Sequence, residues 1–145
     1  MRNWRSQKGA ALLEAAITIP LLLLVSVGIF EFGRAYQTWQ VLTNAAREGA
    51  RIAVLPDPTP GIVEQRVKDY MQMGQLPRWN TASVDVNRAS SITVNGAPAS
   101  ASTVTVDYPF DFMVLGPVAR LVSPQTTLGG ALTMRAQAVM RNEVQ

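Results

Sequence analysis

Hydrophobic and polar positions follow three different patterns along the chain. The first is an apolar run over residues 10–30, interrupted only by Glu14 and a few small hydroxyl side chains. As a helix, with a rise of about 1.5 Å per residue, this run is about 31 Å long, enough to cross a hydrocarbon core of roughly 30 Å. The pattern predicts a transmembrane helix over residues 10–30.

The second pattern is a stripe of apolar and small residues at steps of three and four, which is typical of one helix face. The stripe consists of Gly28, Phe32, Ala35, Trp39, Leu42, Ala46, Gly49 and Ala53, and the opposite side carries Arg34, Gln37, Thr38, Asn44, Arg47, Glu48 and Arg51. We therefore predict one helix from about residue 10 to 55, ended by Pro56-Asp57-Pro58. Gly49 indicates close packing, either on a sheet of the same chain or on a helix of another subunit.

The third pattern begins at residue 56. Thr59, as an N-cap, and Pro60 predict the start of a short amphipathic helix that ends near Gly74. Apolar and polar residues then alternate in four segments, which predicts four half-buried strands around residues 84–87, 92–95, 103–108 and 132–138. One apolar face per strand suits an antiparallel sheet that a helix covers on one side. The predicted fold class is α+β, with a long N-terminal helix, a short helix and a sheet of about four strands.

The connections between the predicted strands carry their own signals. Asn95-Gly96 is a turn signal, but Pro98 soon afterwards favours a loop over a tight hairpin. Residues 97–102 are rich in Ala, Ser and Pro and resemble a linker. Residues 111–131 are expected to be a loop with a short helix around 117–122.

Charge is unevenly placed. The formal charge of the chain is +3, from 13 basic and 10 acidic residues. Arg2, Arg5 and Lys8 precede the apolar run, so the ten remaining basic residues balance the ten acidic ones. No basic patch remains for nucleic acid. Positive charge directly before a span predicts a cytoplasmic N-terminus, with the rest of the chain outside.

Composition excludes most catalytic chemistry. The chain has no Cys and no His, which removes thiol nucleophiles, Cys-type metal sites and any Ser-His-Asp triad. Asp107 and Asp111 are the nearest acid pair, but we interpret them as polar positions at a strand end. Asp85 and Asp107 could face each other, yet a calcium site needs six to eight oxygens. We predict no enzyme activity, cofactor or metal.

Glu14 is the most informative single residue. A carboxylate inside an apolar span costs about 2.5–3.5 kcal/mol on insertion scales. It either lies at the headgroup boundary, protonated or hydrated, or has a partner. A cleaved secretory signal would have a shorter apolar region followed by a small-x-small site, whereas this run leads into Glu31-Phe32-Gly33-Arg34. Glu14 is instead the fifth residue after Gly9, which closes the basic segment.

This arrangement resembles the leader of type IV prepilins, and the first 55 residues resemble TadE-like proteins, the minor pilins or pseudopilins of tight-adherence pili. The resemblance is carried by Gly9, Glu14, Pro20, Glu31-Phe32-Gly33-Arg34 and the segment 45–51. It implies that a prepilin peptidase cuts between Gly9 and Ala10. The new Ala10 ammonium would then pair with Glu14 of a neighbouring subunit. Pro20 is expected to kink the helix or to let subunits slide during assembly.

The resemblance implies a non-enzymatic pilus subunit that functions in pilus assembly and surface adhesion. It divides the chain into a basic leader at 1–9, a span at 10–30, an extracytoplasmic helix at 31–55 and a small periplasmic or extracellular domain at 56–145. The partners would be the bacterial inner membrane, the prepilin peptidase, the assembly platform and other pilins. Three alternatives stay open: an unprocessed single-pass protein that binds an envelope protein, a bulk filament subunit, and an envelope enzyme.

Overall fold

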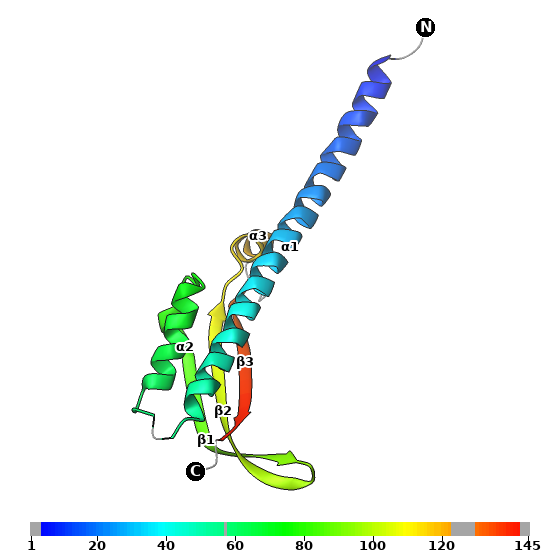
Figure 1. The fold of residues 1–145 in the computed structure, drawn as a ribbon. Coiled ribbons are helices and arrows are strands. Elements are labelled where there is room, and N and C mark those ends of the chain that lie inside the picture. The colour runs from blue at the N-terminus through cyan, green and yellow to red at the C-terminus, as the bar shows by residue number, and fades with distance from the viewer. Residues whose placement is uncertain (1–3, 57, 123–129, 143–145) are drawn as a thin grey trace. The chain divides into compact units, whose positions relative to one another are not determined.

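The computed structural model describes residues 4–56, 58–122 and 130–142. Along the chain the elements are α1, α2, a short 3-10 helix η1 (Trp79–Thr81), then β1, β2, α3 and β3; Figure 1 labels the α-helices and the strands. The predicted α+β class, a long apolar helix followed by a short helix and an antiparallel sheet, is confirmed. The chain forms two compact units: unit 1 is Met1–Arg34 with Phe112–Gly129, and unit 2 is Ala35–Asp111 with Gly130–Gln145. Arg2 and Asp57 of the motifs above lie outside the described residues.

Helix α1 extends without interruption from Trp4 to Ala53. It begins before the predicted residue 10, inside the basic segment, and ends two residues before the predicted 55. At its end the Val54 N–H still donates to the Ala50 carbonyl, whereas the Leu55 N–H donates to Ile52, one residue closer. Pro56 has no N–H and disfavours helical backbone in the residue before it. The helix therefore tightens over its last turn and stops.

Unit 1 contains the N-terminal part of α1 and helix α3 (Leu115–Val122). A short helix was predicted around residues 117–122, and α3 begins two residues earlier. Pro117 is the third residue of α3, where its missing N–H costs no hydrogen bond because the first N–H groups of a helix have no internal partner. The first helical bond runs from the Val118 N–H to the Val114 carbonyl, at 3.0 Å.

The core of unit 2 lies where the C-terminal part of α1, helix α2 (Ile62–Met73) and the sheet meet. Its fully buried side chains include Leu42 of α1, Val67 of α2 and Val104 of the sheet. A Cβ atom at Gly49 would lie 2.5 Å from Cγ2 of Val67 and 3.2 Å from Cγ1 of Val104. Of the two partners predicted for Gly49, the structure thus supports packing within the chain, against α2 as well as the sheet.

The predicted apolar stripe of α1 is correct only in part. Leu42, Ala46, Gly49 and Ala53 are buried as predicted. Phe32 and Trp39, however, are 70% and 45% exposed, and Thr38 of the predicted polar side is buried. Periodicity treated residues 28–53 as one face, but continuous burial begins at Leu42, where α1 enters the core of unit 2.

Helix α2 begins at Ile62, with Gly61 as its N-cap at φ 81° and no side-chain cap. The prediction of Thr59 as N-cap is wrong. The left-handed backbone of Gly61 interrupts the helix after Pro60, and the Thr59 carbonyl accepts only a turn bond from the Ile62 N–H at 3.0 Å. The predicted end near Gly74 is confirmed, since Gly74 is the C-cap and its N–H donates to the Tyr70 carbonyl.

The sheet has three antiparallel strands in the order β1–β2–β3, formed by Ser83–Val94, Ala97–Phe110 and Leu132–Arg141. The prediction of about four strands is wrong, because the first two predicted strands form one long β1. The polar residues between them produce a register shift between Asn87 and Ser90 against β2, not a turn. The predicted one-sided burial is confirmed in β3, where Met134, Ala136 and Ala138 are buried and their neighbours exposed.

A tight hairpin joins β1 to β2. Val94 pairs with Ala97, and the two residues between them, Asn95 and Gly96, have φ of 51° and 81°, as a type I′ turn requires. The predicted loop and the linker at 97–102 are therefore wrong. Pro98 pairs with Thr93, next to the hydrogen-bonded pair Val94 and Ala97 that closes the turn. Because hydrogen-bonded and non-hydrogen-bonded pairs alternate, the backbone nitrogen of Pro98 points away from β1. Its missing N–H costs the ladder nothing, because β3 pairs with β2 only from Ala101 onward.

Candidate functional site

The predicted processing junction and assembly residue lie on one exposed segment of α1 in unit 1. Gly9, Ala10 and Glu14 are all exposed and helical. Within the part of the chain that the structure describes, no side chain pairs with the Glu14 carboxylate. Its backbone carbonyl accepts a hydrogen bond from the Thr18 hydroxyl at 2.7 Å. The carboxylate therefore remains available to a second molecule.

Pro20 lies inside α1 and removes the N–H that would donate to the Ala16 carbonyl. The Thr18 hydroxyl bonds the Glu14 carbonyl, and the Ser26 hydroxyl bonds the Leu22 carbonyl at 2.8 Å. Both hydroxyls thus bond carbonyls other than that of Ala16, and the kink at Pro20 stays a prediction.

The apolar run presents large side chains on every side of α1. By length and composition α1 could cross a membrane, and none of its most apolar 18-residue window is buried within the chain. A helix that is apolar all round requires an apolar environment. The side chains that need this cover are Leu12, Leu13, Ile17, Ile19, Leu21, Leu22, Leu23, Leu24, Val25 and Ile29.

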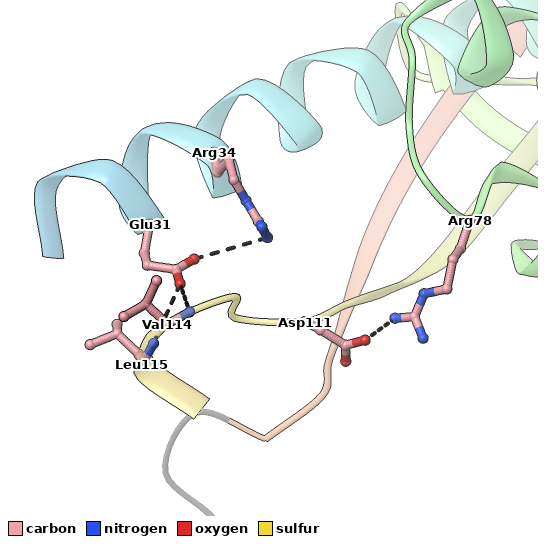
Figure 2. Close-up of polar contacts among 6 residues, drawn as sticks. All are labelled: Glu31, Arg34, Arg78, Asp111, Val114 and Leu115. Carbon is pink, nitrogen blue, oxygen red and sulfur yellow. Dashed lines mark hydrogen bonds and ion pairs between the residues drawn. The ribbon is translucent and has the colours of Figure 1, made fainter. Parts of the chain in front are cut away.

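Glu31 makes a buried contact that the sequence patterns did not predict. It follows the apolar run directly, yet its side chain is fully buried. Its Oε1 accepts hydrogen bonds from the backbone N–H groups of Val114, at 2.5 Å, and Leu115, at 3.4 Å (Figure 2). A carboxylate at this position satisfies two of the unpaired N–H groups at the start of α3 and complements the helix dipole. The motif Glu31-Phe32-Gly33-Arg34 was noticed in the sequence, but nothing local shows that its partner is more than 80 residues away.

The second oxygen of Glu31 has a different environment. Oε2 is buried and accepts no hydrogen bond from the described residues. The Arg34 Nη2 lies 3.9 Å away, which is an ion-pair distance but too long for a hydrogen bond (Figure 2). Arg34 is one turn further along α1 and its side chain is 27% exposed. The cationic group thus offsets the buried negative charge from the water-accessible side.

In unit 2, Arg78 fixes the end of β2. It donates a hydrogen bond to the Pro109 carbonyl at 2.9 Å and pairs with the Asp111 carboxylate (Figure 2). Asp107 pairs with Arg135 on β3 instead, with two hydrogen bonds of 2.7 and 2.9 Å. The two acids that the sequence offered as the nearest acid pair therefore bind separate arginines and form no acid–base pair.

The Asp107–Arg135 pair shifts both ionisations. The hydrogen bond from Arg135, with its positive charge as a smaller contribution, lowers the pKa of Asp107 below its usual value of 3.8. The same hydrogen bond raises the pKa of Arg135. Asp85 lies opposite Thr105 and not opposite Asp107, so the calcium arrangement considered above does not form. The described ranges contain no group of three or more Asp or Glu side chains placed to hold a metal ion.

Arg88 closes the C-terminal end of α1. Its Nε donates to the Ala53 carbonyl and its Nη2 to the Leu55 carbonyl, both at 3.0 Å. The Ser102 hydroxyl contacts the same Ala53 carbonyl at 3.3 Å and donates to Asn142 Oδ1 at 2.7 Å. A cation at the C-terminal end of a helix interacts favourably with the helix dipole, and its N–H groups satisfy carbonyls that have no helical partner. Arg88 lies within the bulge of β1, where the register shifts between Asn87 and Ser90.

Comparison with known protein families gives a match in the N-terminal part of the chain. Residues 9–51 match the TadE family, described as TadE-like protein. The predicted resemblance is thereby confirmed over a segment that includes Gly9, Glu14, Pro20 and Glu31. The match ends before α2, so α3 and the sheet lie outside it. Searches among curated proteins and among solved structures give no significant match.

Proposed function

We propose that this chain is a membrane-anchored, non-enzymatic subunit of a tight-adherence type IV-like pilus, in the role of a minor pilin or pseudopilin that functions in assembly and surface adhesion. One observation carries the proposal: α1 exposes an apolar surface that contains Glu14, whose carboxylate has no partner among the described residues, within the segment that matches TadE-like proteins. An apolar helix with one costly acid suits a subunit that is held in lipid first and by other subunits later.

In this proposal the N-terminus is cytoplasmic and unit 2 is periplasmic. Arg2, Arg5 and Lys8 all precede the apolar run, and short basic segments remain on the cytoplasmic side of a membrane. The bacterial inner membrane is therefore the first location of the subunit, and an extracellular pilus is its destination.

Cleavage between Gly9 and Ala10 by a prepilin peptidase would remove all three of these charges. It would also create an ammonium group four residues before Glu14, on the same helix. A buried carboxylate that lacks a partner is strongly unfavourable, whereas a paired one is tolerated. Because Glu14 has no partner among the described residues, its pairing with Ala10 of a neighbouring subunit would make assembly selective for correct register.

The test compares Glu14→Ala with Glu64→Ala, which removes a surface carboxylate of α2 outside the apolar run. We expect both variants, like the unmodified protein, to show an intact mass that begins at Ala10. We expect only Glu14→Ala to be missing from sheared filaments. Retention of residues 1–9 in cells with an active peptidase would overturn the processing step. Normal filament content of Glu14→Ala would overturn the assembly role of Glu14. Retention of residues 1–9 together with absence of the unmodified protein from filaments would favour the unprocessed single-pass protein.

The number of copies in a filament separates a minor from a bulk subunit. The resemblance implies that major tight-adherence pilins are little longer than their helix, whereas this chain adds α2, α3 and a three-stranded sheet. We expect quantitative mass spectrometry of sheared filaments to find few copies per filament. A filament composed mainly of this chain would show that it is the bulk subunit instead.

A further inference from the structure

We propose that α3 is an interfacial helix, which Glu31 holds against the lipid surface at the C-terminal end of the apolar run. The inference rests on the proposed membrane span and adds a second lipid contact from a distant part of the sequence. Both participants, α3 and the N-terminal part of α1, belong to unit 1.

Helix α3 is attached to α1 at the C-terminal end of the apolar run. The apolar run ends at Phe30, and the next residue, Glu31, binds the N–H groups of Val114 and Leu115 (Figure 2). If residues 10–30 span the hydrocarbon core, the N-terminus of α3 is fixed where that core gives way to headgroups.

The backbone N–H groups at the start of α3 need hydrogen-bond acceptors at the end of the apolar run. A helix start near the hydrocarbon region leaves N–H groups that water cannot reach. A fully buried carboxylate directly after an apolar span is otherwise unfavourable. Each feature compensates the other, because Glu31 Oε1 accepts from two of these N–H groups. The two hydrogen bonds that Glu31 accepts account for an acidic residue directly after the apolar run.

The exposed surface near Glu31 and α3 is mainly apolar. On α1, Phe30 and Phe32 are exposed, and on the α3 side Met113 and Val118 are 62% and 42% exposed. Aromatic side chains are enriched at membrane interfaces. Helix α3 has no acidic residue, and its one charged residue, Arg120, is exposed. An apolar surface with one long cationic side chain suits a lipid surface with anionic headgroups.

These observations favour lipid over a protein partner. The exposed apolar residues on the α3 side belong to the same compact unit as the apolar run of α1, where none of the most apolar window is buried. A protein partner for Met113 and Val118 would compete with the bilayer that the adjacent span already requires.

The test uses the absence of native cysteine, which permits single spin labels in the full chain. Labels are placed at Val118→Cys, at Leu22→Cys in the apolar run and at Gln72→Cys on the exposed side of α2. The protein is reconstituted into vesicles of phosphatidylcholine and phosphatidylglycerol. Collision with oxygen, which concentrates in lipid, is compared with collision with a water-soluble nickel chelate.

We expect the oxygen-to-nickel collision ratio to be highest at Leu22→Cys, several-fold lower at Gln72→Cys and intermediate at Val118→Cys. A ratio at Val118→Cys equal to that at Gln72→Cys would overturn the lipid contact of α3. A low ratio at Leu22→Cys would instead overturn the membrane span, and with it the proposed function. The two failures are thus distinguishable.

Glu31 is tested on the Val118→Cys background. Glu31→Ala is expected to lower the ratio at Val118→Cys towards that of Gln72→Cys, whereas Glu31→Gln, which keeps one acceptor oxygen, is expected to retain most of it. Glu48→Ala, which removes a carboxylate paired with Arg66 in unit 2, is the matched control and should change nothing. The label at Leu22→Cys in each background confirms that the span is intact. An unchanged ratio in Glu31→Ala would overturn the role of Glu31.

Discussion

Unit 1 and unit 2 share one helix but satisfy their apolar side chains in different ways. In unit 1, residues such as Leu22 remain exposed, and the described polar contacts to α3 come from one buried residue, Glu31. In unit 2, Leu42 and Val67 are fully buried, and ion pairs lie on the surface. One continuous helix thus has an exposed apolar surface in one half and takes part in a packed protein core in the other.

Apolar content alone does not define a core in this chain. Unit 1 contains the more apolar part of α1, yet the large apolar side chains there are exposed. In unit 2, by contrast, Ala45, Ala46 and Ala50 of α1 are fully buried. Small residues permit close packing within the chain, whereas large ones on all sides require surroundings that the chain does not supply.

The largest contrast is expected from one substitution made in both units. Leu42→Ala should lower the free energy of unfolding of unit 2 by about 2–5 kcal/mol, because a fully buried leucine leaves a cavity. Leu22→Ala, at an exposed position, should leave it nearly unchanged. Urea unfolding of the full chain in detergent micelles, followed by circular dichroism, measures both. A similar loss of unfolding free energy in both variants would contradict the difference in burial between Leu42 and Leu22.

A second contrast comes from glycines of α1. Gly49→Ala places its new methyl group within 2.5 Å of Val67 Cγ2, and such overpacking costs about 1–3 kcal/mol. Gly33→Ala meets no atom within 4 Å and should favour the helix by up to about 1 kcal/mol. The same unfolding measurement should therefore give changes of opposite sign. Stabilisation by Gly49→Ala would show that the core of unit 2 is looser than its contacts indicate.

A smaller effect is expected from the closure of α1. Arg88→Ala removes hydrogen bonds to the Ala53 and Leu55 carbonyls and should cost about 1–2 kcal/mol, since bonds from charged donors contribute more than neutral ones. Arg47→Ala, an exposed arginine with a 3.5 Å contact to Asn44, is the control and should have little effect. Equal midpoints of urea unfolding for the two variants would mean that Arg88 does not stabilise the end of α1.

The smallest effect is expected from Asp107 and depends on pH. Its pKa is lowered in the folded protein, so the pair with Arg135 contributes stability above the usual pKa of 3.8 and loses it as pH falls through the lower folded value. The thermal midpoint of Asp107→Asn should lie below that of the unmodified protein at neutral pH. The two midpoints should converge in acid. A constant difference across this range would refute the assignment to Asp107.

Much of unit 1 and less of unit 2 could be predicted from sequence. The apolar run, Glu14 and the helical continuation are local features, because each depends on residues close together in the chain. The strand count was wrong because the polar residues around Asn87 form a bulge, not a turn. Pro98 was misread because its effect depends on whether a third strand lies beside it.

The role of Glu31 could not be predicted for the same physical reason. Its partners, Val114 and Leu115, are backbone groups, and any sequence supplies backbone N–H groups. A carboxylate directly after an apolar run was a visible clue, but only the path of the chain after β2 brings α3 to it.

The separation of β2 from β3 in the sequence has a consequence for synthesis. The chain leaves the sheet after Phe110, forms α3 and returns at Leu132. The pairing of β2 with β3 runs from Phe110 with Leu132 to Ala101 with Arg141. Until β3 has left the ribosome, the central strand has one unpaired edge, and such edges can pair with other chains. Loss of β3 would therefore leave this edge of β2 open to aggregation.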